Sequence, residues 1–88
     1  MGDGMTMKLQ AVQIATGSND RESRLVSEDG MLVAILVQLS GEHGALAGKW
    51  FLEVGFGPVK DIHAPLFDDL ETAKVWISSR LADIASND

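Results

Sequence analysis

One short segment of the sequence carries side chains that could do chemistry. Asp61-Ile62-His63 places a carboxylate and an imidazole on the same side of an extended chain, with Asp68 and Asp69 a few residues later. A carboxylate beside a histidine can orient a general base or begin a metal site. With no cysteine and His43 as the only other histidine, a transition-metal site would have few ligands. Asp61 and His63 are therefore candidate ligand-binding residues, and we expect neither a metal nor a cofactor.

Two other features, one rich in glycine and one in serine, predict no catalytic site. The segment 55–58, Gly-Phe-Gly-Pro, is not followed by a helix start that could offer free N–H groups to a phosphate. Ser78 and Ser79 fall inside an expected helix with no histidine nearby, so neither has a base to activate it. The sequence favours a protein without catalysis of its own.

The composition is that of one small acidic domain. The chain has 88 residues, 45% of them hydrophobic, and 13 acidic against 7 basic residues give a net charge of −6. This apolar content excludes intrinsic disorder, and the negative charge disfavours nucleic acid as a partner. We expect a flexible leader at residues 1–6 and a single domain at residues 7–88.

Nothing in the sequence predicts a membrane or secretory protein. The longest apolar run covers residues 31–37, whereas a membrane-spanning helix needs about 20 residues. No basic region followed by an apolar stretch opens the chain, so no secretory signal is expected and the cytoplasm is the default location.

Apolar residues spaced by two predict strands at residues 7–16, 31–39 and 48–56. Residues 24–27 are a candidate for a further short strand, because the Asp29-Gly30 step that follows favours a tight reversal. The first strand mixes the two parities, so its inward face stays open at this point.

Residues 68–86 predict the one helix. Asp68 followed by Glu71 has the form of a capping box at its start. Apolar residues at spacings of three and four then predict one buried stripe: Leu70, Ala73, Ile77, Leu81 and Ile84. The expected fold class is α+β, an antiparallel meander of three or four strands with this amphipathic C-terminal helix packed on one face.

The segment 31–39 is apolar on both parities, although a helix can cover only one face of the sheet. If the helix covers Trp50, Leu52 and Val54, then Phe51 lies on the open face. The predicted open-face interface comprises Leu32, Ala34, Leu36 and Phe51, helped by Val12 and Ile14. Such a patch predicts self-association. The alternatives are cover by residues 21–27 or the N-terminal segment, a different protein, or an apolar ligand.

The last forty residues resemble a known layout. Gly48-Lys49-Trp50, then Phe67-Asp68 leading into Glu71-Thr72-Ala73 and Trp76, are similar to the sheet-plus-helix arrangement of AP2-type and integrase-arm DNA-binding domains. That resemblance implies DNA binding through basic and aromatic residues on the sheet. The basic residues available here are Lys8, Arg24, Lys49 and Lys60, and the net charge of −6 argues against that use.

Three functions follow from the sequence. The first is a small non-catalytic interaction or structural module, homodimeric through its open sheet face. The second is a small-molecule or metal binder, or a minor enzyme, that uses residues 61–69 with His63 as base or ligand. The third, disfavoured by charge, is a nucleic-acid binder that uses the sheet.

Overall fold

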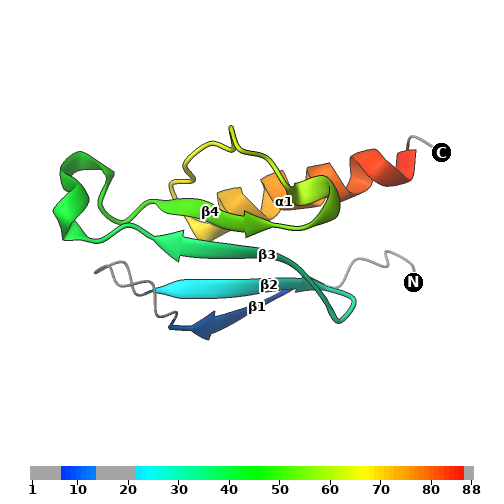
Figure 1. Cartoon of the computed structure of the whole chain (residues 1–88), viewed down its shortest axis with the longest axis horizontal. Coiled ribbons are helices and arrows are strands. Elements are labelled where there is room, and N and C mark those ends of the chain that lie inside the picture. The colour runs from blue at the N-terminus through cyan, green and yellow to red at the C-terminus, as the bar shows by residue number, and fades with distance from the viewer. Residues whose placement is uncertain (1–6, 14–21, 87–88) are drawn as a thin grey trace.

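The computed structural model describes residues 7–13 and 22–86, so the expected leader at residues 1–6 lies outside the described residues. Four antiparallel strands follow one another across a single sheet in chain order, and one helix follows them (Figure 1). The strands are β1 (Met7–Val12), β2 (Ser23–Glu28), β3 (Met31–Gln38) and β4 (Trp50–Gly55), and the helix is α1 (Leu70–Ser86). Two short 3-10 helices, η1 (Gly41–Leu46) and η2 (Gly57–Val59), flank β4. The α+β meander predicted from the sequence is confirmed.

The β2–β3 hairpin forms where the sequence places a tight turn. Asp29 and Gly30 have φ values of 52° and 84°, the left-handed region that two-residue hairpin turns require at both positions. The turn pairs Glu28 with Met31 and makes β2 a full strand. Residues 24–27 therefore belong to the sheet and do not cover its open face.

A β-bulge interrupts β3 near this turn. Val26 pairs with Ala34, but Ser27 pairs with Leu32, so Val33 is an extra residue in β3. Side chains that face each other across antiparallel strands share one face of the sheet. Because of the bulge, Leu32 and Ala34 lie on opposite faces although they are two residues apart.

A second bulge interrupts β4. Leu36 pairs with Leu52, but Ile35 pairs with Val54, so Glu53 is the extra residue. The uninterrupted alternation that the sequence predicts for this strand is wrong from Glu53 onward. Leu52 remains on the face covered by α1, whereas Val54 points to the open face.

The hydrophobic core lies between α1 and one face of the sheet. In Figure 1, α1 crosses behind β4, and the first strand lies at the far edge. Ala73 and Ile77 of the predicted helical stripe are buried, and Leu70, Leu81 and the neighbouring Trp76 pack against them. The buried core side chains are Val26, Ala34, Leu36, Trp50, Val59, Phe67, Ala73 and Ile77.

The first strand turns Met7 and Leu9 toward this core. Leu9 pairs with the buried Val26, while Val12 pairs with Ser23 on the opposite face. The inward face of β1, left open by the sequence, is thus the face of Leu9. Ile14 lies outside the described residues.

The segment between β4 and α1 packs along the outer side of β4. Gly55 must be glycine there, because a Cβ atom would lie 2.6 Å from the carbonyl oxygen of Val59. Arg80 of α1 fixes the same segment: its Nε donates to the carbonyl oxygen of Pro58 at 3.1 Å, and its guanidinium lies 3.4 Å from the Asp61 carboxylate. These contacts hold residues 57–61 between the helix and the sheet.

Candidate functional site

The face of the sheet opposite α1 is the candidate interaction surface. Its middle row runs Gln10, Leu25, Ile35 and Val54 across the four strands; Gln10 at the edge is exposed, and the three apolar members are half-buried. Leu32 and Phe56 are more exposed, at 41% and 44%. We call these five apolar residues together with Phe51 the open face; its members are Leu25, Leu32, Ile35, Phe51, Val54 and Phe56.

The centre of a neighbouring row on the same face is already out of solvent. It runs Val12, Ser23, Val37 and Phe51 across the four strands. Ser23 and Val37 in its centre are 0% and 1% exposed. The accessible part of the face therefore lies beyond this row, toward the β2–β3 hairpin.

Two of the predicted interface residues lie in the core instead. Ala34 and Leu36 are both 0% exposed and belong to the cluster that α1 covers. The prediction that they share a face with Phe51 is wrong, because Phe51 pairs with Val37 and Leu36 pairs with Leu52. Leu32, Phe51 and Val12 do lie on the side of the sheet away from α1.

Sequence reasoning missed Leu25, Ile35, Val54 and Phe56. Leu25 was missed because residues 24–27 were only a candidate strand. Val54 was assigned to the wrong face because the alternating apolar pattern does not reveal a bulge. The hairpin turn fixes the pairing of Glu28 with Met31. To predict from it that Ile35 pairs with Leu25 on the open face, the extra residue Val33 must also be known.

The Asp61–His63 pair is built into a turn. The backbone N–H of His63 donates to Asp61 Oδ1 at 2.8 Å, and the other carboxylate oxygen lies 3.4 Å from Arg80. Both interactions fix the fold of the segment, and the imidazole of His63 is exposed. Within residues 7–13 and 22–86, no three histidine or carboxylate side chains gather closely enough to hold a metal ion.

Two of the basic residues considered for nucleic acid are engaged inside the chain. Arg24 lies 5.1 Å from the ring centroid of Trp50, on the side of the sheet facing α1. Lys49 forms an ion pair with Asp68. The sheet therefore offers fewer accessible cations than the sequence suggests.

The helix cap is Asp69, one residue after the predicted Asp68. The Asp69 carboxylate accepts from the backbone N–H of Thr72 at 2.8 Å and from the Thr72 hydroxyl at 2.7 Å. The Thr72 N–H bond, followed by the hydroxyl bond, lowers the pKa of Asp69 below its ordinary value of 3.8. Asp68 forms an ion pair with Lys49 instead.

Replacing Asp69 with alanine is expected to lower the melting temperature at neutral pH. A carboxyl whose pKa is lowered in the fold stabilises it above the unfolded pKa, and this contribution disappears as the pH falls through the folded pKa. The difference in melting temperature between wild type and Asp69→Ala should therefore shrink in acid, as measured by circular dichroism from about pH 7 down to about pH 2. Asp69→Asn retains an acceptor for Thr72 and should lose less; an equal loss by both variants would contradict the capping role.

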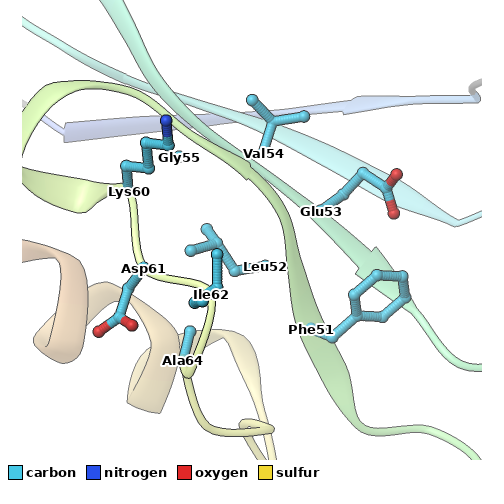
Figure 2. A pocket seen from close by; sticks show the side chains of 9 residues that line it. All are labelled: Phe51, Leu52, Glu53, Val54, Gly55, Lys60, Asp61, Ile62 and Ala64. Atoms are coloured by element: carbon cyan, nitrogen blue, oxygen red, sulfur yellow. The ribbon is translucent and has the colours of Figure 1, made fainter.

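A groove runs along the outer edge of β4 (Figure 2). One wall is the strand from Phe51 to Gly55, and the other is the segment 60–64, which carries Ile62 into the groove mouth. The groove has a volume of about 430 Å³, within the range of sites that hold small molecules or short peptide segments. It shares its Phe51 and Val54 wall with the border of the open face.

Comparison with known proteins adds no family to this description: no family model matches the chain, and no curated protein or solved structure is significantly similar to it. Among the described residues, no helix is both long and apolar enough to cross a membrane. The site must therefore be interpreted from its geometry.

Proposed function

We propose that this protein is a small non-catalytic interaction module that forms a homodimer by packing two open faces against each other. The single observation that supports the proposal is the row of Leu25, Ile35 and Val54, which continues across three strands on the side of the sheet away from α1. In a small antiparallel sheet with one covered face, the other face is ordinarily polar. Here three of the four positions of that row are apolar, and the fourth is Gln10 on the edge strand β1.

A second copy is the partner that suits this surface best. Two sheets pack face to face when their inner side chains are apolar and their strands are nearly aligned. Two copies of this face meet that condition along the row of Leu25, Ile35 and Val54. Such a contact also buries Leu32 and Phe56, which lie near the edge of the patch and are about two-fifths exposed.

The size of the face predicts weak association. The molecule measures 42 × 22 × 19 Å, and the open face covers only part of its broad side. Stable interfaces bury about 800 Å² on each partner, while association costs roughly 4–15 kcal/mol before any contact is counted. We therefore expect a concentration-dependent dimer with a Kd in about the micromolar range.

Replacing Ile35 with lysine tests the proposal. A charge at the centre of the dry contact should raise the dimer Kd at least about tenfold, equivalent to about 1.4 kcal/mol. Sedimentation equilibrium over a wide concentration range measures this, and circular dichroism verifies that the variant is folded. Val75→Lys is the matched control, because Val75 is 68% exposed on α1 and should leave the Kd unchanged.

A wild-type protein that remains monomeric at about 1 mM would refute the homodimer. An unchanged Kd for a folded Ile35→Lys variant would place the contact on another surface. Ligand binding by Asp61 and His63 stays a prediction, tested by the shift in melting temperature of wild type and His63→Ala with divalent metal ions.

A further inference from the structure

The outer edge of β4 pairs with another segment at Trp50, but within the described part of the chain no such pairing continues at Leu52. Trp50 and Phe67 exchange two backbone hydrogen bonds, each 2.8 Å long, in an antiparallel bridge. Between β4 and segment 60–66, the described residues make no other backbone hydrogen bond. The chain therefore pairs with the outer edge of β4 at Phe67 and does not continue this pairing into a fifth strand over residues 60–66.

The reason for the interruption is Pro65. In an antiparallel ladder, the residue two before Phe67 would face Leu52, and proline has no N–H to donate there. Backbone groups alternate between the two edges of a strand, so the N–H and C=O of Leu52 point outward, as those of Trp50 do. They face the groove that opens as segment 60–64 moves away from β4.

We propose that this groove binds an extended peptide segment of a partner protein, which continues the ladder begun by Phe67 and pairs with Leu52. Strand addition of this kind takes its affinity from backbone hydrogen bonds and its selectivity from alternate side chains. Leu52 and Ile62 line the groove and offer apolar contact to one such side chain. Ile62 is 89% exposed, which leaves it available for the incoming segment.

The walls of the groove select among possible occupants. A β4 strand from a second copy would bring its own sheet and its own segment 60–64 into this space, whereas an extended peptide brings one strand alone. Glu53 and Lys60 line the groove with no ion pair among the described residues, while Asp61 is paired with Arg80. In a chain of net charge −6, long-range attraction favours a segment that is apolar at its centre and basic at its ends.

The test uses an end-capped synthetic peptide of sequence Lys-Thr-Val-Thr-Val-Thr-Lys as the probe. On titration into ¹⁵N-labelled full-length protein, the Leu52 amide should shift and become protected from hydrogen exchange, in a saturable manner. Ile62→Ser should weaken binding at least about fivefold. Val75→Ser, the matched change of an exposed apolar residue on α1, should leave binding unchanged.

Two altered peptides sharpen the result. A probe with proline in place of its central threonine loses a backbone donor and should bind at least about fivefold more weakly. A probe with glutamate at both ends should also be weaker. The proposal is overturned if the first probe leaves the Leu52 amide unaffected at about 2 mM, if Ile62→Ser binds equally well, or if the proline or glutamate probe binds as tightly.

Slow exchange of the Leu52 amide in the protein alone would also overturn the proposal, since the edge would then be filled already. Protection that instead grows with protein concentration would assign the edge to a second copy. Because Ile35→Lys disrupts the open face without touching Ile62, the peptide experiment repeated on that variant separates failure of the groove from failure of the homodimer.

Discussion

Replacing Leu36 with alanine is expected to destabilise the fold by about 2–5 kcal/mol. Leu36 is 0% exposed and lies in the middle of β3, within the cluster covered by α1. The substitution removes its apolar contacts and leaves a cavity between sheet and helix. For a domain of this size, each kcal/mol lowers the melting temperature by about 4–8 °C, so thermal unfolding followed by circular dichroism will register the change clearly.

Leu32→Ala is the matched control for Leu36→Ala. Leu32 lies on the same strand but is 41% exposed, beyond the bulge and on the open face. Its replacement should lower stability by less than about 1 kcal/mol. If Leu36→Ala only weakened self-association and left the monomer as stable as wild type, the placement of Leu36 in the core would be wrong.

The second large effect is expected for Phe67→Ala, at about 3–5 kcal/mol. The Phe67 side chain is 1% exposed, and its ring lies 5.6 Å from that of Trp76 at 58°, a tilted arrangement that adds to simple burial. The total stability of a domain this small is about 4–13 kcal/mol. The variant should therefore be largely unfolded at moderate denaturant concentrations where wild type is folded, as measured by urea denaturation.

The neighbouring residue supplies the control for Phe67. Leu66 is 41% exposed, so Leu66→Ala should change stability by no more than about 1 kcal/mol. Alanine at position 67 keeps the backbone groups that bond Trp50, so the loss measures the side chain. Equal effects of the two substitutions would mean that Phe67 does not anchor the segment to the helix.

Local signals were enough to predict the elements of this fold. The Asp29-Gly30 step predicted the hairpin turn, and the three- and four-residue spacing predicted the buried face of α1 through Ala73 and Ile77. The helix cap differs from the prediction by one residue because Asp68 and Asp69 are both suitable capping residues; in the structure Asp69 accepts from Thr72 and Asp68 pairs with Lys49.

The candidate site was harder to predict because a face is a property of several strands together. Each apolar residue of β3 could lie on either face of the sheet, so the face it occupies depends on its pairing with β2 and β4. One extra residue at Val33 and another at Glu53 reversed the assignments of Leu36 and Val54. Neither bulge has a composition that distinguishes it from ordinary strand.

Glu53 has one further consequence, for the way this chain would be aligned with any relative. Glu53 adds one residue to β4, so the side chains after it point to the face opposite the one that simple alternation predicts. A related chain without this residue would need a gap at that position for Val54 to keep its place beside Ile35. An alignment without that gap would assign the residues after Glu53 to the wrong face of the sheet. It would therefore also misidentify which residues at the end of β4 belong to the open face.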